Sequence, residues 1–121
     1  MKCRDIIELL EHEFPMKYAE SWDNTGFQVG NREKEVTHIF VAMDVTDENI
    51  EEAIHVGADM IVTHHPMIFS PLSSITGDTI NGRRVIKMIE NGICYMSTHT
   101  NYDSCRNLYV WTCSRYRFQS F

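Results

Sequence analysis

The sequence has no run of about 18 apolar residues, so it contains no segment that predicts a membrane-spanning helix. It has no Gly-x-x-x-x-Gly-Lys motif, which excludes the phosphate-binding loop of P-loop proteins. Its four cysteines have no Cys-x-x-Cys spacing, and we therefore expect reduced thiols rather than a disulfide framework. Basic residues are also scarce: 11 Lys and Arg stand against 17 Asp and Glu, which argues against nucleic acid as a partner.

The length of 121 residues fits one domain with a hydrophobic core. The hydrophobic fraction of 43% and the charged fraction of 23% are ordinary for a globular protein. An amphipathic pattern begins almost at the N-terminus and includes Glu8, Glu11 and Glu13, whereas a secretory signal has no acidic residues there. We therefore expect the protein in the cytoplasm.

The spacing of apolar residues predicts three helices and three strands. The helices are expected at 4–14, 46–57 and 79–91, and the strands at 37–45, 59–64 and 93–98. The strands are continuously apolar and alternate with helices, which predicts an α/β fold, a three-layer unit with a mostly parallel sheet. Residues 19–30 contain turn-forming residues, and we expect Trp22 and Phe27 to anchor this segment to the core.

The second predicted strand ends in two adjacent histidines, His64 and His65, and Pro66 follows them. Neutral histidine is the commonest metal ligand among side chains, so this pair indicates a metal site. Neighbouring residues of a regular strand point to opposite faces, and the two imidazoles therefore cannot aim at one point from within it. Two alternatives remain: one histidine is structural, or each binds a different metal of a pair about 3.5–4 Å apart.

Other metal-capable or polar residues also fall at or just past the carboxyl ends of the predicted strands, the edge at which open α/β sheets bind ligands. They are Asp44, His99 and Asp103. Asp103 can supply an oxygen ligand. His99 is a ligand, a hydrogen-bond donor to the site, or an ordinary strand-end residue, and Asp44 either orients a ligand or forms a turn.

Histidines combined with carboxylates suit Zn, Fe, Ni or Mn rather than Mg or Ca. We interpret His12, His38 and His55 as ordinary hydrogen-bonded side chains. None of the cysteines has a histidine-paired context, and no catalytic base can be identified from the sequence.

Four segments together resemble the NIF-three-like family, whose members are also labelled GTP cyclohydrolase type 2 homologues. They are residues 22–30, 42–46, 63–66 and 97–103, and they occur in the family's order and spacing. The resemblance covers about residues 1–103. Thr25 and Phe27 are mild departures, because the family often has Val and Leu there.

The resemblance implies a centre of two divalent metal ions, usually within a toroidal homohexamer. By position, His64 and Asp103 match ligands of one ion and His65 matches a ligand of the other, whereas His99 and Asp44 match family positions that are not direct ligands. The implied activity is metal-dependent hydrolysis of a purine nucleotide or a similar small molecule. The alternative is a metal-stabilised oligomeric scaffold that binds a regulatory protein without turnover, and a third interpretation is that this chain has lost both roles.

The resemblance divides the chain into residues 1–103, equivalent to the N-terminal half of the family domain, and a tail at 104–121. The tail has no glycine and no acidic residue, whereas the family continues with a glycine-rich turn and a further helix. A His-x-x-x-Glu segment that supplies the family's remaining ligands is also missing. One interpretation is a frameshift or truncation after Asp103, and the other is a genuine short variant whose tail packs on the exposed half-core.

Overall fold

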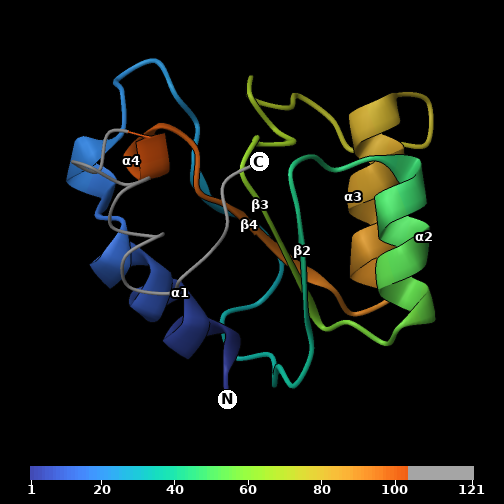
Figure 1. Cartoon of the computed structure of the whole chain (residues 1–121). Coiled ribbons are helices and arrows are strands. Elements are labelled where there is room, and N and C mark those ends of the chain that lie inside the picture. The colour runs from blue at the N-terminus through green and yellow to red at the C-terminus, as the bar shows by residue number, and fades with distance from the viewer. Residues whose placement is uncertain (104–121) are drawn as a thin grey trace.

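One four-stranded sheet has helices on both of its faces in the computed structural model, which describes residues 1–103 (Figure 1). The strands are β1 (Gly26–Val29), β2 (Ile39–Ala42), β3 (Met60–Thr63) and β4 (Cys94–Ser97), and their order across the sheet is β1-β4-β3-β2. β2 pairs with β3 and β3 with β4 in parallel, whereas β1 is antiparallel to β4. The predicted α/β fold with a mostly parallel sheet is therefore confirmed.

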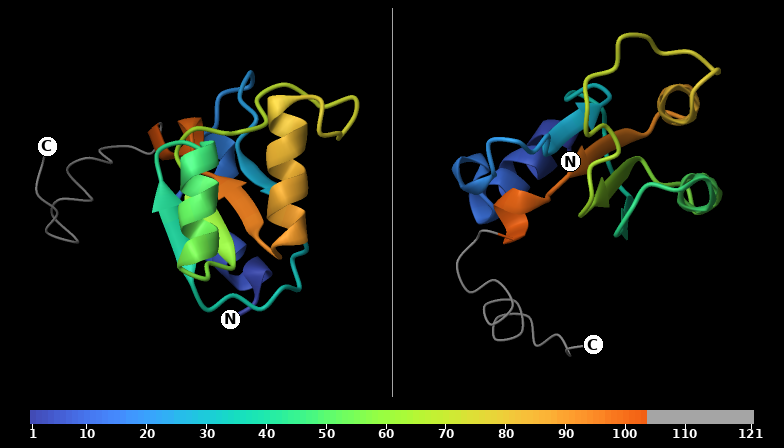
Figure 2. Two further views of the ribbon diagram at one scale, coloured as in Figure 1. Left: turned by 90° about the vertical axis from the view of Figure 1, so that its right-hand side faces the viewer. Right: turned by 90° about the horizontal axis from the view of Figure 1, so that it is seen from above.

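Three helices agree with the sequence prediction. They are α1 (Cys3–Glu13), α2 (Asp47–His55) and α3 (Ile80–Glu90). The hydroxyl of Thr46 accepts the Asn49 N–H and so caps α2, and Thr79 caps α3 in the same way through the Gly82 N–H. Figure 2 shows α2 and α3 side by side over one face of the sheet and α1 on the other. Within the described residues, no helix combines the length and the apolar character needed to cross a membrane.

The sequence prediction missed three short elements. They are β1, the 3-10 helix η1 (Met16–Tyr18) and the helix α4 (Thr100–Asp103). The segment 19–30 was expected to be a turn, but its second part forms β1 and pairs with β4. Each missed element has only three or four residues, too few for a helical or strand-like hydrophobic period to become visible.

The sheet separates two hydrophobic core clusters. On the side of α2 and α3, Ile61 of β3 and Tyr95 of β4 join buried residues of both helices. On the side of α1, the neighbouring strand residues Met60, Val62 and Met96 pack against the apolar face of that helix. β3 and β4 are thus buried on both faces, which explains their continuous apolar sequence and fixes the position of the loops that follow them.

The strand β2 is more exposed than its continuously apolar sequence predicts. Its residues Ile39 and Val41 are exposed, Val41 at 74%, and Met43 just beyond the strand is exposed as well. Phe40, which points to the opposite face, packs against the cluster on the α2 and α3 side. β2 lies at the edge of the sheet, and the core cluster on the α1 side includes none of its residues.

Gly30 provides a test of how closely β1 packs on β4. Its φ is +116°, and a Cβ atom there would lie 2.9 Å from Sγ and 3.0 Å from Cα of Cys94. We expect Gly30→Ala to lower the free energy of unfolding by about 3 kcal/mol, because backbone strain and overpacking add. Urea denaturation measures this loss.

Gly57→Ala is the matched control for Gly30→Ala. Gly57 also has a positive φ, +74°, but a Cβ atom there meets no atom within 4 Å. Its substitution therefore carries the backbone penalty alone, about 1 kcal/mol. Equal losses in the two variants would show that the contact between Gly30 and Cys94 is not tight.

Candidate metal centre

The strand β3 ends at Thr63, one residue before the histidine pair. The sequence predicts a strand that includes residue 64, in which the alternation of side chains separates the two imidazoles. Since both histidines lie beyond the strand, that constraint does not apply, and their ring centroids are 4.8 Å apart. The pair can therefore face one common site.

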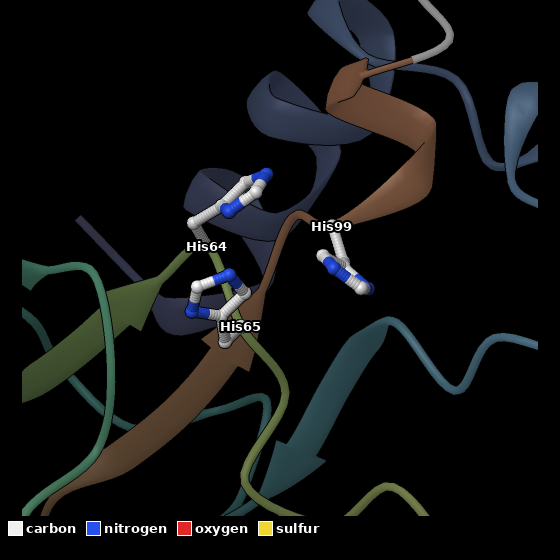
Figure 3. Close-up of side chains that lie close together, drawn as sticks. All are labelled: His64, His65 and His99. Carbon is white, nitrogen blue, oxygen red and sulfur yellow. The ribbon is translucent and has the colours of Figure 1, made fainter.

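A third imidazole lies beside this pair. His99 follows β4, and its ring centroid is 5.1 Å from that of His64 and 5.4 Å from that of His65. One ring nitrogen from each of the three histidines lies within 4.8 Å of the others (Figure 3). The parallel pairing of β3 with β4 places Thr63 opposite Ser97, so the residues that follow the two strands meet at the same edge of the sheet.

The ring of His65 contacts a carboxylate that follows β2, the strand beside β3 in the sheet. Its Nδ1 lies 2.6 Å from Oδ1 of Asp44, which follows β2, and its backbone N–H donates to the carbonyl of Met43 at 2.9 Å. A carboxylate only accepts hydrogen bonds, so Nδ1 carries the proton. The Nε2 lone pair of a neutral His65 is then available to a ligand. This contact is compatible with the orienting role of Asp44, one of the two alternatives from the sequence.

The ring of His99 also contacts a carboxylate, that of Asp23, and this pair is more buried than the exposed pair of His65 and Asp44. Its Nδ1 lies 3.1 Å from Oδ1 of Asp23, whose side chain is 0% exposed. The other carboxylate oxygen accepts from the Thr100 N–H at 3.0 Å and from the Thr100 hydroxyl at 2.6 Å. Burial raises the pKa of Asp23, but the hydrogen bonds from Thr100 and His99 together outweigh it, so this pKa lies below its ordinary value and the carboxylate is ionised.

Asp23 is a residue of the candidate site that the sequence does not indicate. It lies in the turn-forming segment 19–30, part of which also carries the family resemblance, but nothing in the sequence pairs it with His99, which is 76 positions away. Two further contacts join the same segments: Thr25 accepts from the His99 N–H, and the Glu20 N–H donates to the hydroxyl of Thr100. The segment 20–25 therefore holds the segment 99–100 in place.

A buried hydroxyl pair fixes the backbone around His65. The hydroxyl of Tyr95, a fully buried residue, lies 2.6 Å from the hydroxyl of Thr63 and accepts from the Met67 N–H at 3.0 Å. The carbonyl oxygen of His65 is 2.7 Å from the Thr63 hydroxyl and 3.1 Å from that of Tyr95. Burial raises the pKa of Tyr95, so its hydroxyl keeps its proton at neutral pH.

Asp103, the third ligand expected from the sequence, ends α4. Its side chain lies outside the part of the chain that the structure describes, as do residues 104–121, so the predictions for both stay predictions. The donor set within the described residues consists of imidazoles, two of them oriented by carboxylates. Such a set fits Zn, Fe or Ni, and a carboxylate ligand would extend the fit to Mn.

Known proteins are similar to this chain over most of its length. The model of the family described as Duf34/NIF3 (NGG1p interacting factor 3) matches residues 1–114. A Clostridium perfringens protein named GTP cyclohydrolase 1 type 2 homolog is 47% identical over 106 residues, which are 88% of this chain and 40% of that protein. The chain thus spans 40% or less of the length of the curated relatives it matches.

Solved structures agree with the computed fold. A hypothetical protein of Staphylococcus aureus matches with a TM-score of 0.81 and 40% identity, over 85% of this chain and 34% of its own. Reduced HcgD of Methanocaldococcus jannaschii matches with a TM-score of 0.80 and 33% identity, over 99% of this chain and 48% of its own.

Replacement of Asp23 tests the orientation of His99. We expect the His99 proton to reside on Nδ1 in the wild type and to distribute over both ring nitrogens in Asp23→Asn, because the ionised acceptor is lost. Nitrogen-15 NMR of the imidazoles above the histidine titration range measures this tautomer. Asp44→Asn is the matched variant: it should change the tautomer of His65 and leave that of His99 as it is. A single effect shared by both variants would contradict the pairing.

Replacement of the Tyr95 hydroxyl tests the support of the histidine loop. Tyr95→Phe removes the acceptor of the Met67 N–H, so we expect a loss of about 1–2 kcal/mol in the free energy of unfolding. Amide hydrogen exchange at Met67 should become faster. Tyr18→Phe, at an exposed tyrosine, is the control and should change neither quantity. Unchanged exchange at Met67 in Tyr95→Phe would mean that the hydroxyl does not hold this loop.

Proposed function

Because this chain belongs to the Duf34/NIF3 family, we propose that it carries the first part of a centre for two divalent metal ions, Zn, Fe, Mn or Ni. His64 and Asp103 would hold one ion and His65 the other. The activity we propose is metal-dependent hydrolysis of a purine nucleotide or a similar small molecule. The name of the Clostridium perfringens relative, GTP cyclohydrolase 1 type 2 homolog, supports this choice of substrate class.

One observation carries the proposal: three imidazoles converge at the sheet edge, and carboxylates fix two of them. Histidine ligands of metals characteristically donate their second ring N–H to a carboxylate or a carbonyl, which sets the tautomer and the ring orientation. Asp44 does this for His65. The orientation of this ring therefore matches what a metal ligand requires.

His99 has a separate role in this proposal. Its position in the chain is not that of a direct ligand in the family, yet its ring lies beside both candidate ligands. Asp23 binds Nδ1–H and leaves Nε2 as a proton acceptor, so we assign His99 as the general base. Bound divalent ions would supply Lewis acidity and a water of lowered pKa at this place.

The alternative proposal is a metal-stabilised oligomeric scaffold that binds a regulatory protein without turnover. The observation that favours it is the apolar surface next to His64. A groove of about 570 Å³ extends there over Val41, Met43, Val62 and Tyr102. Exposed apolar surface of this kind marks interaction sites. The homohexamer and the cytoplasmic location that the resemblance and the N-terminus imply remain predictions under both proposals.

Metal content tests the proposal directly. We expect near-stoichiometric Zn, Fe, Mn or Ni in gently purified wild-type chain, and a clear loss in His64→Ala, because one ligand is removed. Elemental mass spectrometry measures the content per chain. His55→Ala is the control, since His55 lies on α2 and outside the cluster of three histidines. A wild type without metal, or a His64→Ala variant with full content, would overturn the metal centre.

GTP hydrolysis by the same samples distinguishes the enzyme proposal from the scaffold proposal. Hydrolysis of GTP that a chelator abolishes and that falls at least about 100-fold in His99→Gln supports the enzyme, because a general base contributes about that factor or more. A metal-loaded chain that does not hydrolyse GTP supports the scaffold.

A further inference from the structure

Trp22 is exposed, whereas the sequence predicted that it is buried in the core. It was expected to anchor the segment 19–30 to the core, and Phe27 of the same segment does pack against the α1-side cluster. The Trp22 side chain instead is 59% exposed, and it contacts a second exposed aromatic, Phe69, which is 49% exposed. Their ring centroids are 6.1 Å apart at an angle of 41°. We call this pair the aromatic shelf.

The aromatic shelf lies beside the histidine cluster. The centroids of the Trp22 and His99 rings are 6.3 Å apart, and the two rings meet edge to face at 80°. Through His99 the shelf is continuous with the rings of His64 and His65. A small molecule that reaches the imidazoles can therefore also touch the shelf.

Hydrogen bonds tie the two chain segments of the shelf together. The side-chain amides of Asn24 and Gln28 both donate to the carbonyl of Ile68, at 2.6 and 2.9 Å, and the Ile68 N–H donates back to Gln28 at 3.0 Å. Ile68 directly precedes Phe69, and the buried Asp23 directly follows Trp22. The backbone on both sides of the shelf is thus fixed before any ligand binds, and the ordering cost of binding is reduced.

The distance between the two rings of the shelf determines how a ligand can bind to them. A centroid distance of 6.1 Å lies within the range of direct aromatic contact, so no ring can enter between Trp22 and Phe69. The two side chains form one apolar surface instead. Large exposed aromatic faces at a site stack planar rings, and such stacking depends little on which base is bound.

We propose that the aromatic shelf binds the planar ring of an aromatic heterocycle of the nucleobase type, and that the polar substituents of this ligand reach the histidine cluster. This inference rests on the proposed function for the chemistry at the cluster, and it adds the residues that recognise the ring. Trp22 and Phe69 bind and orient the ligand through its ring and take no part in proton transfer.

The test uses GMP and ribose 5-phosphate, which differ by the base. In the full chain with Trp111→Phe, Trp22 is the single tryptophan, and its fluorescence reports on the shelf. We expect GMP to quench this fluorescence and ribose 5-phosphate to leave it unchanged. By calorimetry, Trp22→Ala in the wild-type background should weaken GMP binding about tenfold without affecting ribose 5-phosphate, and Trp22→Phe should restore most of the loss.

One control variant and one second test variant make the experiment specific. Tyr18→Ala removes another exposed aromatic, whose ring is covered by Lys17 at 5.2 Å, and should leave GMP binding as in the wild type. Phe69→Leu keeps an apolar side chain but removes the second ring, so it should weaken GMP binding as well. Phe69→Leu replaces Trp22→Ala as the test variant if circular dichroism shows that Trp22→Ala does not fold.

The outcomes separate this inference from the proposed function. Metal content is measured on every variant, and GMP binding is measured with and without metal. A metal-loaded wild type that binds GMP no better than ribose 5-phosphate, or unchanged GMP binding in folded Trp22→Ala, overturns the shelf and leaves the metal centre standing. A chain without metal whose Trp22 is still quenched by GMP alone overturns the metal centre and supports the shelf.

Discussion

The parallel register between β3 and β4 is the constraint on which the candidate centre depends. It sets Thr63 opposite Ser97 and so places the loops after both strands at one edge of the sheet. Both strands are buried on both faces, so a shift of either by one residue would move its side chains into the wrong core cluster. The hydrophobic packing that fixes the register therefore also fixes the distance between His64, His65 and His99.

Polar contacts turn this coarse placement into a defined arrangement of rings. Asp44 and Asp23 each accept from one imidazole, and the buried hydroxyl of Tyr95 holds the backbone at His65 and Met67. Asp23 is the most demanding of these groups, because a buried carboxylate is costly unless its hydrogen bonds are satisfied. Thr100 and His99 satisfy them with three donors. The same carboxylate thereby orients a ring of the candidate site and the start of α4.

The sequence was informative where the signal is local and repeated. The periodic helices α1, α2 and α3 and the buried strands β3 and β4 could be predicted, and so could the meeting of strand ends that brings the histidines together. Contacts between distant segments could not, because nothing near Asp23 in the chain points to His99. The exposure of Val41 and Trp22 was missed for a related reason: the apolar character of a residue does not reveal whether another element covers it.

The two exposed apolar surfaces around the cluster differ in a way that bears on recognition. The groove beside His64 is lined mainly by aliphatic side chains such as Val41 and Met43, and Tyr102 adds one aromatic ring next to His64. The aromatic shelf beside His99 presents rigid flat rings on a backbone tied by hydrogen bonds through Ile68. Because Trp22 and Phe69 are both exposed whereas Tyr102 of the groove is only partly exposed, we assign recognition of a heterocycle to the shelf rather than to the groove. The reacting end of such a ligand would then lie toward His99, the residue whose second nitrogen Asp23 leaves open as a proton acceptor.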